Sequence, residues 1–254
     1  EAGEERLRVG GMHGREQRNH IGRLAAQGGK GTAGNRAGVE VPGMRGDDGS
    51  TEDWDYRELN RRSRIVAWRL HALGIRPGDR VVGFMPNMPQ TIIAMLAAAS
   101  LGGVWSSCSP DFGVQGVLDR FGQIEPKVLF CADGYVYNGQ RHDSLGRVRE
   151  IAAQLPSVRK VVVAPLLEQR PDLSDIPNAV TIDEWLRRFT PGDIDYAQMP
   201  FDHPLYILFT SGTTGKPKCI VHGAGGSLLS GLKMYKLQFD VRAGDRFFYY
   251  TTCN

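Results

Sequence analysis

The feature that most constrains this chain is an alternation, from Trp54 onward, of short apolar runs with longer amphipathic stretches. Apolar runs of about four to six residues have the length of buried strands, and the intervening stretches of about ten or more fit helices. We expect strands at 80–85, 104–107, 127–132, 159–164, 205–209, 219–222 and 246–250, and helices at 56–73, 89–101, 114–123, 144–155, 182–189 and 227–235. This order predicts an α/β fold with mostly parallel sheets flanked by helices.

The first 53 residues differ in composition from the rest. They hold 13 of the 32 glycines and none of the 22 aromatic residues. A segment without large apolar side chains cannot bury enough surface to offset the entropy lost when its backbone is ordered. We therefore expect residues 1–53 to form a glycine-rich, disordered tail and residues 54–254 to form the folded part.

Charge and cysteine usage argue against several classes of site and partner. The 31 Lys and Arg residues face 28 Asp and Glu residues, so the net charge of +3 gives little support for nucleic-acid binding. The 4 cysteines have no spacing typical of a metal site or a disulfide framework, which favours a reducing environment and no metal ligands. The sequence has no apolar run of about 18 residues and no apolar leader, so we expect a cytoplasmic protein without a membrane partner.

The segment with the most chemical content is TSGTTGKPK at residues 210–218, which lies between two expected strands. Its glycines permit positive φ angles and let backbone N–H groups approach an anion closely. Its hydroxyls donate hydrogen bonds and its lysines supply positive charge. The composition therefore suits the phosphates of a nucleotide.

Two common phosphate-binding motifs are not present. Thr210 and Pro217 stand where a Walker A loop has a glycine and a hydroxyl residue. The run GAGG at 223–226 begins like a dinucleotide-binding fingerprint, but Leu228 occupies the place of the last glycine. The alternative interpretation of the TSGTTGKPK loop is a flexible surface turn.

Several segments together resemble one family. TSGTTGKPK is similar to the phosphate-binding loop of the adenylate-forming enzymes, which include the acyl-CoA synthetases. The segments WSSCSPDFG at 105–113, CIVHGAGG at 219–226 and GDRFFYYTTC at 244–253 resemble the acetoacetate–CoA ligase branch. The resemblance spans residues 54 to 253. The loop is specific to the superfamily, whereas the other segments favour acetoacetate as the acyl substrate.

The resemblance implies a two-step ligase. ATP and acetoacetate first form an acyl-adenylate with release of pyrophosphate, and the thiol of coenzyme A then displaces AMP. The implied ligands of the ATP phosphates are Thr210, Ser211, Gly212, Thr213, Thr214, Gly215 and Lys218. The resemblance also implies a Mg²⁺ ion that bridges the phosphates, and Arg141 as a candidate contact of coenzyme A.

Some of these residues also have a structural interpretation. His222 follows an apolar strand and is near enough to the loop to approach the nucleotide, although packing is the commoner role of such a histidine. Asp111 and Arg120 fit a helix start with an ion pair, and Arg141 also fits a solvated surface arginine. The cysteines at 108, 131 and 219 lie in or beside apolar strands and fit small core residues.

The resemblance ends before the family's later motifs. The acidic ATP- and metal-binding motif, the hinge and the C-terminal domain with the catalytic lysine have no counterpart in the sequence. We therefore expect residues 54–254 to be an incomplete large adenylation domain, with no catalytic residue and no activity by itself. Two rival functions stay open: a synthetase for acetate or propionate, since the segment that shapes the acyl pocket would follow Asn254, and a non-catalytic truncated product.

Overall fold

The structure of the protein is a computed structural model. It describes residues 40–45, 51–187, 195–210 and 215–242, with Asp245, Phe247 and Cys253, and it describes residues 40–45 and 51–55 as backbone only. The expected strand at 246–250 lies outside the described residues, apart from Phe247.

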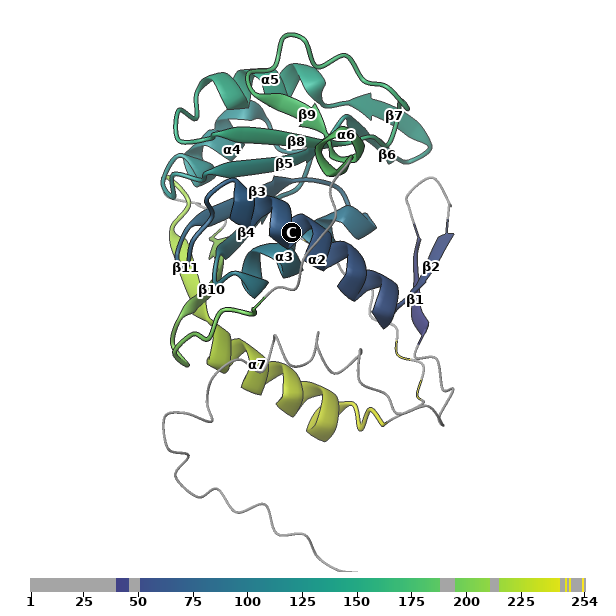
Figure 1. The fold of residues 1–254 in the computed structure, drawn as a ribbon, viewed down its shortest axis with the longest axis vertical. Helices are drawn as coiled ribbons and strands as arrows, with labels where there is room; N and C mark the ends of the chain where they lie inside the picture. The colour runs from purple at the N-terminus through teal and green to yellow at the C-terminus, as the bar shows by residue number, and fades with distance from the viewer. Residues whose placement is uncertain are drawn as a thin grey trace, which may run out of the picture.

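A seven-stranded sheet with the order β11-β10-β4-β3-β5-β8-β9 forms the centre of the molecule (Figure 1). Its strands are β3 (Arg80–Phe84), β4 (Val104–Cys108), β5 (Val128–Ala132), β8 (Lys160–Ala164), β9 (Ala179–Thr181), β10 (Pro204–Phe209) and β11 (Cys219–Gly223). Neighbouring strands run parallel except for β10 and β11, which pair antiparallel. The expected α/β fold with a mostly parallel sheet is confirmed.

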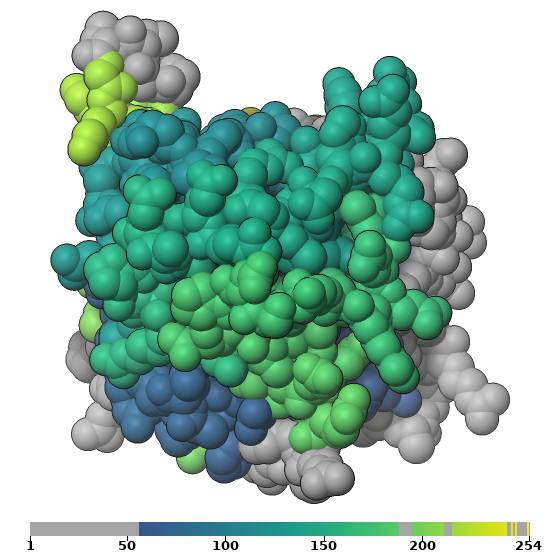
Figure 2. Space-filling view, turned by 90° about the horizontal axis from the view of Figure 1, so that it is seen from above, coloured from purple at the N-terminus to yellow at the C-terminus, as the bar shows by residue number. Residues whose placement is uncertain are grey.

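Helices cover both faces of this sheet. One layer holds α2 (Tyr56–Ala72), α3 (Pro89–Ser100) and α6 (Ile182–Leu186), and the other holds α4 (Val114–Phe121) and α5 (Leu145–Ala153). Because successive strand side chains point to opposite faces, Val128 and Phe130 of β5 pack in the first layer, while Leu129 and Cys131 pack in the second. Figure 2 looks onto the end of the molecule where the segments from β5 to α6, teal to green, form a continuous surface.

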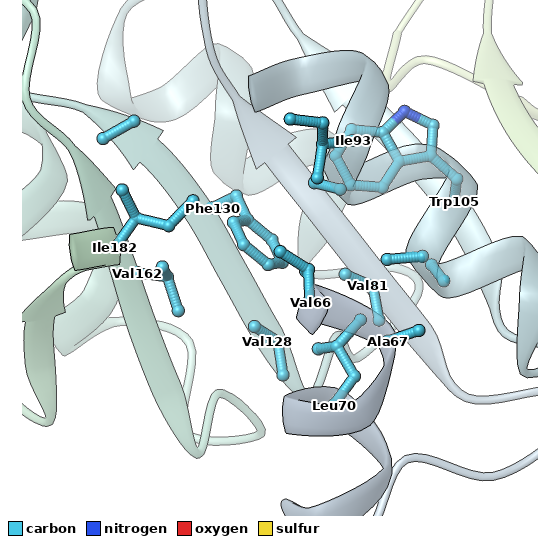
Figure 3. Close-up of a cluster of buried hydrophobic side chains, with 14 of the residues drawn as sticks. Val66, Ala67, Leu70, Val81, Ile93, Trp105, Val128, Phe130, Val162 and Ile182 are labelled. Atoms are coloured by element: carbon cyan, nitrogen blue, oxygen red, sulfur yellow. The ribbon is translucent and has the colours of Figure 1, made fainter. Parts of the chain in front are cut away.

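The first layer illustrates how the sequence sets the packing. Val66 and Leu70 of α2 and Ile93 of α3 lie over Phe130 and Trp105 of the sheet (Figure 3). A Cβ atom at Gly83 of β3 would lie 2.7 Å from the ring of Trp105, so only glycine leaves room for the indole. The apolar stripe of each helix thus packs against the apolar side chains that the strands direct to the same face of the sheet.

Three short strand pairings were not expected from the sequence. β6 (Gly134–Tyr137) and β7 (Gln140–Asp143) form an antiparallel hairpin, β9 extends the main sheet, and β1 (Glu40–Arg45) pairs antiparallel with β2 (Thr51–Asp55). In the β6–β7 hairpin, Asn138 and Gly139 have φ angles of 49° and 76°, as a tight turn of the type I′ family requires. These strands lack the apolar runs that identify buried strands, which is why the pattern did not reveal them.

The β1–β2 pair corrects the expected boundary at residue 54. Backbone at 40–45, which we expected to be disordered, forms a strand that pairs with residues 51–55. The other residues of the expected tail, 1–39 and 46–50, lie outside the described residues. Disorder stays a prediction for them.

The C-terminal part of the described chain is less well packed than the rest. Helix α7 (Ala224–Lys233) continues into a π-helical turn, η1 (Met234–Gln238), and neither element has a buried residue. In Figure 1, α7 lies apart from the two helix layers that cover the sheet. Within the described part of the chain, no helix has the length and apolar composition that crossing a membrane requires.

Candidate phosphate-binding site

The TSGTTGKPK segment joins the antiparallel strands β10 and β11, which end their pairing at Phe209 and Cys219. Because β10 runs parallel to β4, the segment leaves the sheet on the side where the parallel strands have their carboxyl ends. Ligands of open α/β sheets bind on this side. The strand–loop–strand setting expected from the sequence is therefore confirmed.

Thr210 and Lys218 close the base of this hairpin. The Thr210 N–H donates to the Lys218 carbonyl at 3.1 Å, and the Lys218 N–H donates to Thr210 Oγ1 at 3.0 Å. Since Oγ1 accepts this bond, the Thr210 hydroxyl keeps its own proton to donate to a ligand. Thr210 thus both shapes the loop and retains one donor.

The described residues at the exit of the loop combine exposed charge with a glycine at positive φ. Gly215, Lys216 and Lys218 are exposed, whereas Pro217 is buried. Gly215 has a φ of +149°, and a Cβ atom there would meet no atom within 4 Å, so the backbone angle alone favours glycine at this position. The other predicted phosphate ligands, Ser211, Gly212, Thr213 and Thr214, lie outside the described residues, and their role stays a prediction.

Two side chains near the carboxyl ends of neighbouring strands hold the backbone of Cys253. The Cys253 N–H donates to Asn87 Oδ1 at 2.7 Å, and Ser107 Oγ donates to the Cys253 carbonyl at 3.0 Å. Asn87 follows β3 and Ser107 belongs to β4, so both lie towards the carboxyl ends of parallel strands. Neither residue was expected from the sequence, where the available signal was a polar side chain at or after the end of each apolar strand.

Arg141 and His222 have structural partners. Arg141, in β7, is exposed and donates to the carbonyl oxygen of Leu167. The β6–β7 hairpin, which contains Arg141, and the β10–β11 hairpin lie on opposite sides of the molecule in Figure 1. His222 stacks on Tyr206 of the paired strand, with ring centroids 4.8 Å apart. This contact favours the packing interpretation of His222.

Arg120 packs against an aromatic ring. Its guanidinium lies 4.6 Å from the centroid of the Phe112 ring, and Nη1 donates to the Gly116 carbonyl at 2.7 Å. Asp111 is exposed. These contacts give Arg120 the structural role expected for it, although its partners are a ring and a carbonyl group.

The cysteines divide into two groups. Cys108 and Cys131 are buried, as expected for small core residues. Burial raises the pKa of the Cys108 thiol to about 12 although nearby Arg120 lowers it, and burial also raises the pKa of Cys131. Cys219 is exposed, so the expectation that it lies in the core was wrong. The reason is that β11 is an edge strand.

The glycines of the GAGG run serve close packing. The N–H groups of Ala224 and Gly225, in the first turn of α7, donate to the carbonyls of His203 at 2.8 Å and Phe201 at 2.9 Å. A Cβ atom at Gly225 would lie 2.2 Å from the Phe201 ring. Because backbone carbonyls already occupy these two donors, the first turn of α7 is not arranged for an anion.

The chemistry of the hairpin suits an anion and its counterion. Residues 210–218 carry two lysines and no carboxylate. Among the residues that the structure describes, no group of three or more His, Cys, Asp and Glu side chains is placed to hold a metal. Beside nucleotides, Mg²⁺ is usually held chiefly by phosphate oxygens and water, so this hairpin needs no carboxylate to accommodate it.

Comparisons with known proteins agree with this geometry. A family model described as AMP-binding enzyme matches residues 32–253, which begins before the expected boundary at residue 54. An acetoacetyl-coenzyme A synthetase of Rhizobium meliloti (strain 1021) is 48% identical over 211 residues, which are 83% of this chain and 32% of that protein. An acetoacetyl-CoA synthetase of Mus musculus is 45% identical over 202 residues, 78% of this chain and 30% of that protein. A malonamoyl-CoA synthetase, vrtB, of Penicillium aethiopicum is 42% identical over 214 residues, 82% of this chain and 30% of that protein.

A solved structure has the same fold. An acetoacetyl-CoA synthetase from Streptomyces lividans matches with a TM-score of 0.77 and 41% identity, over 90% of this chain and 34% of that chain. This chain therefore spans about a third of the length of the relatives it matches. Since the family model covers most of the sequence and the sheet has the matching architecture, the chain belongs to the AMP-binding enzyme family.

Proposed function

We propose that the chain supplies the ATP phosphate-binding part of a ligase that joins acetoacetate to coenzyme A through an acyl-adenylate. The observation that carries the proposal is the hairpin closed by Thr210 and Lys218, which exposes two lysines beside a glycine at positive φ. Donors and cations fixed in advance stabilise the charge that grows on the leaving pyrophosphate when the bond to the α-phosphorus breaks. The names of the relatives support acetoacetate as the acyl group.

The described residues of the loop would contact the phosphates of ATP in different ways. Lys218 would supply positive charge, and the Thr210 hydroxyl would donate its remaining proton to a phosphate oxygen. The residues at 211–214 would complete the loop with backbone N–H groups and hydroxyls, as the sequence predicts. Bound Mg²⁺ would neutralise phosphate charge, and Arg141 would contact a phosphate of coenzyme A.

The acyl group and the setting belong to the same proposal. A synthetase for acetate or propionate is the rival, and the malonamoyl-CoA synthetase at 42% identity is a relative named for another acyl group. We propose a cytoplasmic enzyme of small-molecule substrates, acetoacetate, ATP and coenzyme A, without a nucleic-acid or membrane partner. Use of acetoacetate would place it in ketone-body and lipid metabolism.

The first test is direct binding of ATP to the chain by calorimetry, in matched lysine variants. Lys218→Ala should weaken ATP binding about tenfold or more, because charge-assisted hydrogen bonds contribute about 1.5–3 kcal/mol. Lys233→Ala removes another exposed lysine, in the last turn of α7, and should leave the affinity unchanged. Equal losses in both variants, or no binding by the unsubstituted chain, would contradict the proposal.

A second test separates the two half-reactions in a form of the enzyme that catalyses them. Replacing Thr213 and Thr214 together by Ala should slow ATP–pyrophosphate exchange at least about tenfold, since 1.4 kcal/mol is about one decade in rate. Thioester formation from a preformed acyl-adenylate should change much less, because pyrophosphate has already left. Equal impairment of both steps would favour the surface-turn interpretation of the loop.

A further inference from the structure

Gln123, two residues after the end of α4, contacts the exit arm of the phosphate loop. The phosphate loop is the 210–218 segment, and its exit arm is Pro217, Lys218 and the following Cys219. The amide nitrogen of Gln123, Nε2, donates to the carbonyls of Asp119 at 2.5 Å and Pro217 at 2.8 Å. Its Oε1 accepts a hydrogen bond from Cys219 Sγ at 3.8 Å. A single side-chain amide therefore contacts the residues on both sides of Lys218.

The end of α4 also contacts the residue that precedes the phosphate loop, Phe209. The guanidinium of Arg120 lies 6.0 Å from the centroid of the Phe209 ring, and Phe209 is the last residue of β10. Phe209 pairs with Cys219 across the hairpin. The end of α4 and the following Gln123 thus contact the residue immediately before the 210–218 segment, a residue within it and the residue immediately after it.

Among the residues that the structure describes, the strand that follows the loop pairs with a neighbour on one side only. β10 is held by β4 on its far side, whereas β11 is an edge strand whose residues Cys219, Ile220 and Val221 are exposed. A hairpin arm supported on one side only moves more easily than a central strand. Phosphate recognition needs donors held within about 0.5 Å of the productive geometry, which such an arm does not guarantee by itself.

We propose that Gln123 is a positioning residue for the phosphate loop. By holding Pro217 and Cys219, it fixes the backbone of Lys218, and through the paired hydrogen bonds of Thr210 and Lys218 it fixes the base of the loop. The part of this inference that concerns ATP rests on the proposed function. The part that concerns the loop backbone rests on the contacts alone.

The test compares two glutamines near the same helix in the whole chain. Gln123→Ala removes the contacts with the hairpin, and Gln123→Glu keeps the size of the side chain but removes the N–H donor. Gln115→Ala is the matched control, because the Gln115 amide donates to Asp119 Oδ1 at 2.8 Å and is exposed on α4. The measurements are amide hydrogen exchange at Thr210 and Lys218 and the dissociation constant of ATP, with circular dichroism as the check on folding.

Both Gln123 variants should accelerate exchange at Thr210 and Lys218 about three- to tenfold and should weaken ATP binding by a similar factor, the effect of losing one neutral hydrogen bond. Gln115→Ala should change neither. Unchanged exchange in the Gln123 variants would overturn the inference, and so would faster exchange with unchanged ATP affinity. If the unsubstituted chain bound no ATP, the proposed function would fail, while the exchange rates would still decide whether Gln123 holds the arm.

Discussion

Strands β5 and β11 belong to the same sheet and have similar apolar sequences, VLFCA and CIVHG, but their environments differ. Every residue of β5 is buried between the two helix layers. In β11 the first three residues are exposed, and the helix that follows it has no buried residue. An apolar run therefore identifies a strand without fixing its place in the sheet.

The same contrast separates two regions of the molecule. The core region, from α2 to α6, has helices on both faces of the sheet, and its apolar side chains make up most of two buried clusters. The edge region, β10, β11, α7 and η1, carries the phosphate loop and exposes apolar side chains, among them Val221 at 55% and Leu237 at 79%. Binding loops are commonly drawn from the less stable parts of a fold, which are positioned by a more rigid scaffold.

The largest expected effect tests this division with one substitution in each region. Leu129→Ala in β5 should lower the free energy of unfolding by about 2–5 kcal/mol, because it leaves a cavity in a fully buried site. Leu237→Ala in η1 should change it by no more than about 0.5 kcal/mol, because the side chain is largely exposed. Urea denaturation of the two variants measures both values. Similar losses would show that the edge region contributes to the cooperative core.

An intermediate effect is expected within α7, where two adjacent glycines have different surroundings. Gly225→Ala should destabilise the protein by about 1 kcal/mol, since the new Cβ would overlap the Phe201 ring and force it to move. Gly226→Ala meets no atom within 4 Å and should stabilise by about 0.5–1 kcal/mol, the usual gain in a helix. Thermal unfolding distinguishes the two. A stabilising Gly225→Ala would mean that Phe201 is not held against the helix.

The smallest effect concerns the surface of the core region. Hydrogen bonds from Arg61 and then Arg62 lower the pKa of Glu58 from its usual 4.5 to about 2. Because the folded-state pKa is depressed, the stabilisation is complete above pH 4.5 and is lost as the pH falls towards 2. These side chains are partly exposed, so we expect less than about 1 kcal/mol. Glu58→Gln should flatten the acid side of the stability–pH curve slightly, and a curve of unchanged shape would contradict this expectation.

Much of the core region was predictable from sequence. The central strands β3, β4, β5 and β8 are apolar runs that are buried on both faces, so each had a clear pattern, and the structure confirms them within one or two residues. The β6–β7 hairpin was missed because β7 reads QRHD, which has no apolar face, and its only signal was the Asn138-Gly139 turn. Local pattern predicts elements that bury surface and misses those that do not.

The sequence predicts the chemistry of the candidate site, but it does not predict the contacts that support the site. The composition of the 210–218 loop predicts phosphate binding there, and the structure confirms the flanking strands of that prediction. Gln123 contacts Pro217 across 94 positions of sequence, and Asn87 contacts Cys253 across 166. No local pattern records such partners, because they meet only when distant elements pack. The sequence therefore predicts residues for phosphate binding, but it does not indicate which distant side chains contact them.

One buried hydrogen bond has a consequence for the order in which the chain folds. Ser106 Oγ in β4 donates to the Ile207 carbonyl in β10 at 2.7 Å, across 101 positions of sequence. Closing so long a loop costs more chain entropy than the pairings of β3 with β4 or β5, so we expect β10 to join a sheet that is already formed. During synthesis, the outer edge of β4 would stay unpaired until the ribosome has released residue 207. In that interval the unpaired edge of β4 can pair with other chains. We therefore expect the chain to be most prone to aggregation, and to depend most on chaperones, at this stage of synthesis.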